Sequence, residues 1–228
     1  MTETELERIR AAYEARDAAG ASPYRWDNPG YVAYMQIVER ALLKAFWDAG
    51  VSLEGARVLD VGAGSGYFLH RLQEYGAGEA HGIDLMDERV AEGRRRYPTL
   101  DLRTGSATSL PYADREFDLV TQFTCLSSIL DHEVRLAVAR EMRRVASGWV
   151  LSFDMRGVSM PSLRRPAYKS TPTIGIDEDE LRRLFGEPTL LRRAALPFEI
   201  AQRTGTPLGT VKSRMRLGLL AMRKVLSP

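Results

Sequence analysis

The 228-residue sequence has a single cysteine, Cys125, and lacks any apolar run long enough to cross a membrane. One cysteine cannot form an intramolecular disulfide, so we expect a reducing, intracellular setting. A membrane-spanning helix would need about 20 consecutive apolar residues. The opening MTETELERIRAAYEAR is acidic and lacks the basic-then-apolar layout of a secretory leader. We therefore predict a cytoplasmic protein with no membrane partner.

A strong net charge is also absent, because 32 Lys and Arg oppose 30 Asp and Glu. With 44% hydrophobic and 27% charged residues, the composition is typical of a globular protein with a substantial core. The charge is nevertheless unevenly distributed along the chain: from Arg192 onward there are eight basic residues and a single acidic one, Glu199. We therefore expect one large domain followed by a tail of a different character.

Strand-like apolar runs alternate with helical patterns from residue 57 onward. The runs expected to form strands are 57–62, 79–85, 100–106, 116–124 and 148–155, with a possible sixth at 188–196. The helical patterns are 3–19, 31–49, 65–76, 86–98, 131–147 and 177–186. This alternation predicts an α/β fold with a Rossmann-like, doubly wound, mostly parallel sheet. We divide the chain into an N-terminal helical lid segment (1–50), a core (51–196) and a basic helical tail (197–228).

Three glycines, Gly62, Gly64 and Gly66, stand at alternate positions directly after the first expected strand. Glycine allows a tight turn there and lets a ligand approach without a Cβ clash. The dinucleotide pattern G-x-G-x-x-G would need glycine where Tyr67 stands, and a Walker loop would need a lysine that is absent. Neither a pyrophosphate nor a triphosphate is therefore the preferred ligand.

Two acidic residues narrow the chemical class of the expected ligand. Asp84 ends the second expected strand, and a carboxylate there can accept both hydroxyls of a ribose lying across the strand ends. Asp60, two residues before the first glycine, favours a ligand with a cationic amino-acid end. The pattern therefore indicates a nucleoside that carries an amino acid.

Four segments in order, VLDVGAGSG, GIDL, GSATSLPYADREFDLV and the stretch to SGWVLSFDM, resemble the successive motifs of class I S-adenosylmethionine (SAM) methyltransferases. The resemblance covers about residues 24–195. YRWDNPGYVAYMQIVERALL and TQFTCLSSILDHEV are similar to the bacterial small-molecule enzymes of the ubiquinone/menaquinone methyltransferase branch. The resemblance implies SAM as cofactor, S-adenosylhomocysteine (SAH) as product, a small-molecule acceptor and no metal.

The resemblance also implies roles for particular residues. The turn from Asp60 to Gly66 would hold the methionine end of SAM, Asp84 the ribose, and Leu85 and Met86 would pack near the adenine. Where the family usually has an acid that contacts the adenine amino group, this chain has Ser106, a weaker acceptor. We therefore expect weak SAM binding. The complete set of expected cofactor-binding residues is Asp60, Gly62, Ala63, Gly64, Ser65, Gly66, Asp84, Leu85, Met86, Ser106, Ala107, Gln122 and Phe123.

The reaction implied is direct in-line displacement, because the sulfonium of SAM is already a good leaving group and the protein mainly has to align the acceptor. A hydroxyl acceptor would benefit from a general base, for which His132 is the candidate; the alternative is a surface histidine beside a helix start. The residues expected to face the acceptor are Tyr24, Trp26, Tyr34, Ser127 and Ser128. The aromatic members of this set could equally pack the N-terminal helices onto the sheet.

The tail departs from this pattern. Residues 198–226 resemble the promoter-reading helix-turn-helix of sigma factor region 4, with a recognition helix over 208–226. The same residues stand where the methyltransferase sheet receives its last, antiparallel strand. Three accounts remain, in order of preference: helices packed on the edge of the enzyme, recruitment of LGLLAMRKVL as that strand, and DNA binding. The last would make the protein a SAM-binding or DNA-linked regulator. The sequence gives no oligomeric state.

Overall fold

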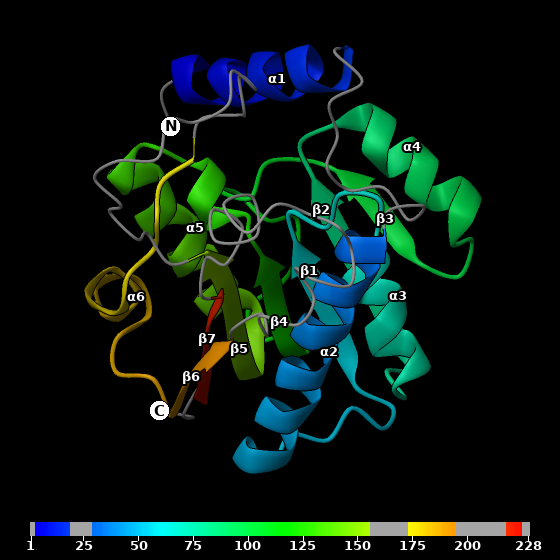
Figure 1. Cartoon of the computed structure of the whole chain (residues 1–228), viewed down its shortest axis with the longest axis vertical. Helices are drawn as coiled ribbons and strands as arrows, with labels where there is room; N and C mark the ends of the chain where they lie inside the picture. Colours follow the sequence, from blue (N-terminus) through cyan, green and yellow to red (C-terminus); the bar gives the residue numbers. More distant parts are fainter. Residues whose placement is uncertain (1–2, 19–28, 156–172, 195–217, 225–228) are drawn as a thin grey trace.

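A computed structural model describes residues 3–18, 29–155, 173–194 and 218–224 of the chain (Figure 1). Tyr24, Trp26 and the side chain of Tyr34, which we expected to face the acceptor, lie outside the described set. In the described ranges, no helix is long and apolar enough to cross a membrane.

The strands form one seven-stranded sheet in the order β3-β2-β1-β4-β5-β7-β6. Strands β1 to β5 pair in parallel, whereas β7 is antiparallel to both of its neighbours. The predicted doubly wound, mostly parallel sheet is therefore confirmed. The strands are β1 (Arg57–Val61), β2 (Glu79–Asp84), β3 (Asp101–Thr104), β4 (Phe117–Phe123), β5 (Ala146–Met155), β6 (Leu190–Ala194) and β7 (Gly218–Lys224).

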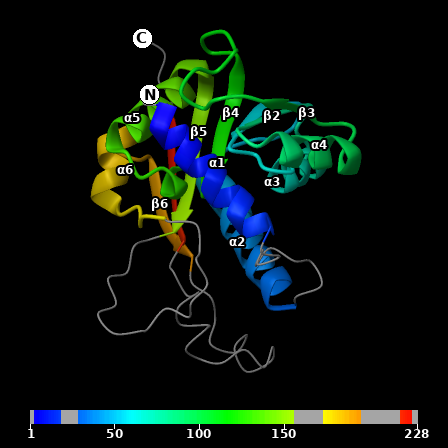
Figure 2. The same ribbon diagram turned by 90° about the horizontal axis from the view of Figure 1, so that it is seen from above.

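Helices cover both faces of the sheet, and α1 crosses its upper end (Figures 1 and 2). Helices α2 and α3 lie against one face, and α5 and α6 against the other. The helices are α1 (Glu3–Ala18), α2 (Pro29–Ala49), α3 (Tyr67–Glu74), α4 (Asp87–Arg96), α5 (His132–Val145) and α6 (Glu178–Phe185), with a short 3-10 helix η1 (Leu126–Ser128).

The central strand β1 shows why its sequence is a continuous apolar run. Successive side chains of a strand point to opposite faces, and helices cover both faces of this sheet. Val58 belongs to the same buried cluster as Leu42 of α2, whereas its neighbour Leu59 belongs to the cluster that contains Val138 of α5. Val58 and Leu59 are fully buried, and each such side chain contributes about 1.5–3 kcal/mol to folding. This burial fixes β1, and with it the loop that follows.

The tail prediction needs a correction. Gly218–Lys224, which we placed in the recognition helix, form β7, inserted between β5 and β6. The helix is therefore wrong for these residues, and the second-ranked account, recruitment as the antiparallel strand, is what the structure has. A short apolar run is compatible with either a helix or a strand. Here the edges of β5 and β6 supply backbone hydrogen-bond partners on both sides, which favours the strand. Residues 195–217 lie outside the described ranges.

Candidate functional site

A cavity of about 170 Å³ opens at the carboxyl ends of the parallel strands, beneath α1. The loops after four adjacent strands line it, represented by Gly62, Leu85, Gly105 and Thr124. The chain order reverses between β1 and β4, so these loops diverge there. Open α/β sheets bind ligands at such a switch point. The cavity is therefore the candidate site.

The glycine loop after β1 reaches this site through Gly62. Gly64 has a φ of +56°, and a Cβ added to it would meet no heavy atom within 4 Å. Gly62, with a φ of +76°, sits so close to the loop after β4 that an added Cβ would lie 2.7 Å from Cys125 Cβ and Sγ. The loop therefore presents bare backbone beside free space at Gly64, as a cradle for a ligand requires.

Asp84 holds this loop in place from the end of β2. Its Oδ2 accepts a hydrogen bond from the Gly64 N–H at 2.8 Å and its Oδ1 one from the Met86 N–H at 2.9 Å. Burial raises the pKa of Asp84, although these N–H groups and Arg89 oppose the rise. A carboxylate has about four lone-pair sites, so acceptor capacity remains beside these backbone hydrogen bonds for a ribose hydroxyl. The residues present therefore fit a nucleoside.

Asp60 is a buried acid behind the glycine loop, 2% exposed. Thr121 Oγ1 donates to its Oδ1 at 2.8 Å. Burial, with a smaller contribution from repulsion by Asp84, raises the pKa of Asp60 to about 8. Asp60 is not among the cavity-lining residues, so a cationic ligand would meet it only through the loop.

Asp60 makes fold stability depend on pH. Its pKa is 3.8 unperturbed and about 8 in the fold, so the folded protein binds a proton that the unfolded chain releases between these values. This stabilising contribution is complete below pH 3.8, declines as pH rises from there, and is fully lost once pH exceeds about 8. Calorimetric melting should show the Tm of the wild type falling more steeply than that of Asp60→Asn between about pH 5 and pH 8.

A second variant checks the cause. Thr121→Val removes the hydrogen bond that lowers the pKa of Asp60, so it should move the loss of stability to higher pH. Parallel pH profiles for the wild type and Asp60→Asn would contradict the assignment.

The rest of the expected cofactor set divides into two groups. Gly62, Asp84, Leu85, Met86, Ser106, Ala107 and Phe123 line the cavity together. The Ser106 hydroxyl hydrogen-bonds the Thr108 hydroxyl at 2.9 Å. Ala63, Gly64, Ser65 and Gly66 belong to the loop but are not lining residues, and the fully buried Gln122 does not reach the cavity. Whether these residues bind a cofactor stays a prediction.

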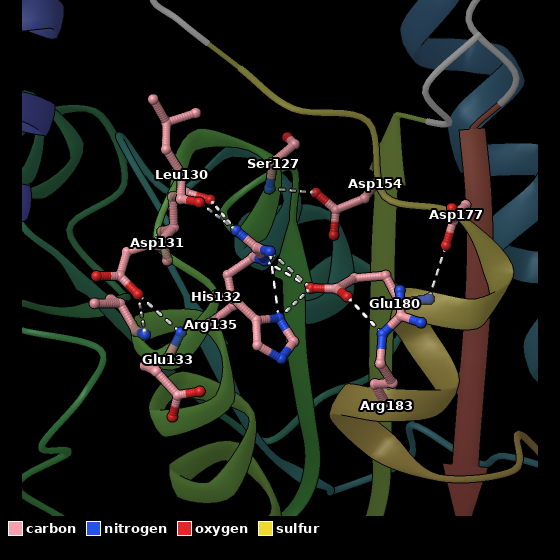
Figure 3. A network of polar contacts seen from close by, with 12 residues as sticks. Ser127, Leu130, Asp131, His132, Glu133, Arg135, Asp154, Asp177, Glu180 and Arg183 are labelled. Atoms are coloured by element: carbon pink, nitrogen blue, oxygen red, sulfur yellow. Dashed lines mark hydrogen bonds and ion pairs between the residues drawn. The ribbon is translucent and has the colours of Figure 1, made fainter. Parts of the chain in front are cut away.

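Of the expected acceptor-facing residues whose side chains the structure describes, Ser128 lines the cavity and Ser127 does not; the Ser128 hydroxyl lies 2.8 Å from Tyr13 Oη of α1. Ser127 is buried and donates to the Thr124 carbonyl at 3.1 Å. His132 is not a lining residue: its Nδ1 lies 2.9 Å from Glu180 Oε1, in an ion-pair cluster with Arg135 that joins α5 to α6 (Figure 3). The geometry therefore gives His132 a structural partner and no access to the cavity.

Sequence reasoning expected a lid segment at 1–50 but did not single out the residues of α1 that line the cavity. Leu6, Ile9 and Tyr13 line the cavity from above, and the Arg89 guanidinium lies 4.4 Å from the Tyr13 ring centroid. Arg8 ties α1 to the rim by donating to the Ser128 carbonyl at 2.7 Å. The 3- and 4-residue spacing of the three apolar side chains was a readable signal of a helix face that packs on something.

Comparison with known proteins agrees with this geometry. Residues 58–147 match the family model described as a methyltransferase domain. A demethylmenaquinone methyltransferase of Beutenbergia cavernae is 40% identical over 84 residues, covering 37% of this chain and 35% of that protein. A second, from Renibacterium salmoninarum, is 37% identical over 98 residues, covering 43% and 40%. The matches thus span well under half of these relatives' length.

Solved structures extend the similarity to the whole fold. Magnesium protoporphyrin IX methyltransferase from Synechocystis with bound SAM aligns with a TM-score of 0.66 at 15% identity, covering 95% of this chain and 96% of that one. A SAM-dependent methyltransferase from Methanosarcina mazei aligns with a TM-score of 0.62 at 20% identity, covering 77% and 94%. At such identities the likeness establishes the fold.

Proposed function

We propose that this chain, whose residues 58–147 match the methyltransferase-domain family, is a class I, SAM-dependent enzyme that transfers a methyl group from SAM to a small-molecule acceptor. The observation that carries the proposal is the pairing of the bare Gly64 backbone with Asp84 at the switch point of the sheet. This pairing places a bare backbone turn directly behind the carboxylate of Asp84, which lines the cavity.

The lining residues divide the work of binding. Asp84 would accept the ribose hydroxyls, and the apolar side chains of Leu85, Met86 and Ala107 would enclose the adenine. When bound, SAM supplies a methyl group on a sulfonium, which needs no further activation. Leu6 and Ile9 of α1 cover the cavity and would exclude water from it.

The titratable side chains of the described lining favour alignment over proton transfer. They are Asp84, Arg89, Cys125 and Tyr13, and no histidine, glutamate or lysine is among the described lining residues. Burial raises the pKa of the Cys125 thiol, so it remains neutral. Holding two reactants in line can contribute about 7–11 kcal/mol in favourable systems. We therefore propose displacement without an enzyme-bound intermediate, onto an oxygen, nitrogen or carbon nucleophile.

The direct test is transfer of labelled methyl from SAM to a panel of acceptors, together with calorimetric titration of SAH. Demethylmenaquinone and magnesium protoporphyrin IX belong first in the panel, because the similar proteins are named for them. Binding of a nicotinamide or phosphorylated nucleotide in place of SAH would refute the proposal.

Ser106 gives a prediction about affinity. The hydroxyl is a weaker acceptor than the acid that the family usually has at this position, and it already pairs with Thr108. Ser106→Asp should tighten SAM binding several-fold by titration calorimetry. Ser106→Ala is the matched control, which should bind no better than the wild type. Unchanged or poorer affinity of Ser106→Asp would contradict the assignment.

The alternative, a DNA-linked regulator, depends on a recognition helix over 208–226. The described residues oppose it, since Gly218–Lys224 are committed to β7. Methyl transfer is therefore the function that we put forward.

A further inference from the structure

Two fully buried polar side chains beside the candidate site have no part in the function proposed above. Gln122 lies on β4 and Asp154 on the adjacent β5, and each is 0% exposed. Gln122 Nε2 donates to Asp154 Oδ2 and, at 2.6 Å, to Ser152 Oγ. Buried polar groups are costly unless satisfied, so an amide and a carboxylate at this depth need a reason.

The outward atoms of this pair hold the backbone of the turn after β4. Gln122 Oε1 accepts from the Cys125 N–H at 2.8 Å and from the Leu126 N–H at 3.4 Å. Asp154 Oδ1 accepts from the Ser127 N–H at 3.0 Å (Figure 3). The first N–H groups of a helix have no partner within the helix. Here two side chains from neighbouring strands cap η1 in place of a local residue.

The turn that they hold is unfavourable by itself and forms part of the cavity. Thr124 has a φ of +60°, in the left-handed region that a β-branched residue rarely adopts. Thr124, Cys125 and Ser128 line the cavity. Cys125 also lies against Gly62 without room for a single extra Cβ. A shift of the turn would therefore move both the cavity wall and the glycine loop.

We propose that Gln122 and Asp154 are positioning residues of the cofactor site, which act by fixing the Thr124–Ser128 turn against the glycine loop. The inference rests on the proposed function, because SAH is the probe that reads the site. It assigns Gln122 a role behind the wall of the cavity rather than in contact with the cofactor.

The pair can be tested by exchanging its two ends. Gln122→Glu alone would set two carboxylates against each other, and Asp154→Asn alone would set two amide N–H₂ groups against each other. The double variant restores one carboxylate and one amide, with the same acceptors aimed at the three backbone N–H groups and the same net charge. Recovery in the double variant would therefore report the contact between the two side chains.

Two readouts separate positioning from general stability. One is the Kd for SAH by calorimetry, well below each variant's Tm. The other is the rate at which an aromatic disulfide reagent labels Cys125, the only cysteine in the chain. The matched control is Ser147→Ala, which removes the 2.9 Å bond from Ser147 Oγ to the Phe117 carbonyl. That bond joins the same two strands at their other end.

We expect each single variant to bind SAH at least about ten-fold more weakly and to label faster, because a buried partner is lost. The double variant should recover most of both losses, and Ser147→Ala should lower Tm alone. Folded single variants with wild-type affinity and labelling, or a double variant no better than its parents, would overturn the inference. If the single variants do not fold, a double variant that folds and binds SAH supports the inference. A double variant that fails to fold or to bind SAH overturns the inference. A wild type that fails to bind SAH would refute the proposed function instead, and the labelling rates would still decide the positioning.

Discussion

Asp84→Ala is expected to weaken SAH binding at least about 100-fold while leaving the protein folded. The carboxylate is the only acid in the described lining, and it supports the site in two ways. It offers acceptors to the ribose. It also accepts hydrogen bonds from the Gly64 N–H in the loop after β1 and from the Met86 N–H after β2, which hold these two segments in place. Alanine removes both contributions at once.

Stability should change little in this variant. Burial raises the pKa of Asp84, so the ionised carboxylate is unfavourable in the fold. Removing this buried charge should therefore offset the free energy lost with its two backbone hydrogen bonds. Asp87→Ala is the matched control: this exposed acid in the first turn of α4 carries the same charge but does not line the cavity. It should leave the Kd for SAH within about two-fold by calorimetry. An Asp84→Ala variant that binds SAH like the wild type would remove the ground for the proposed function.

Gly62→Ala is expected to be the most destabilising single-methyl substitution in the glycine loop, by about 3 kcal/mol or more in urea unfolding. Its Cβ would enter within 2.7 Å of Cys125 Cβ and Sγ, and a φ of +76° adds the strain of a left-handed residue. The loop cannot retreat easily, because the Gly62 N–H donates to the Ile83 carbonyl at 2.8 Å.

Gly64→Ala separates the two causes. Gly64 has a similar φ of +56°, but an added Cβ there meets nothing within 4 Å. Only the conformational cost of about 1 kcal/mol should therefore appear. Cys125→Gly placed in the Gly62→Ala background removes the clashing atoms and should recover part of the loss. Equal destabilisation by the two glycine substitutions would show that the contact with Cys125 is not the cause.

The candidate site was predictable to the extent that it depends on strand ends. The glycines and Asp84 follow directly after strands, and parallel strands bring their carboxyl ends to one edge, so the sequence places these residues together. His132 illustrates the opposite case. Its partner Glu180 is 48 positions away on α6, a pairing that no local pattern reveals.

The sequence did not reveal that Gln122 lies away from the cavity or that residues 218–224 form a strand, for different reasons. Strand β4 is buried on both faces over nearly all of its length, so no alternation distinguishes side chains that face the cavity from those that face β5. The apolar run at 218–224 suits a helix or a strand equally, and what decides is the pair of open edges on β5 and β6. The direction of the Gln122 side chain and the conformation of residues 218–224 both depend on contacts with residues distant in the sequence.

The position of β7 has a consequence for biosynthesis. β6 pairs only with β7 among the described strands, yet the ribosome makes β6 first and then residues 195–217 before β7 begins. Until β7 emerges, the growing polypeptide exposes the unpaired edge of β5 and an unpartnered β6. During translation this interval is the one in which a chaperone, or another nascent copy, can capture the sheet.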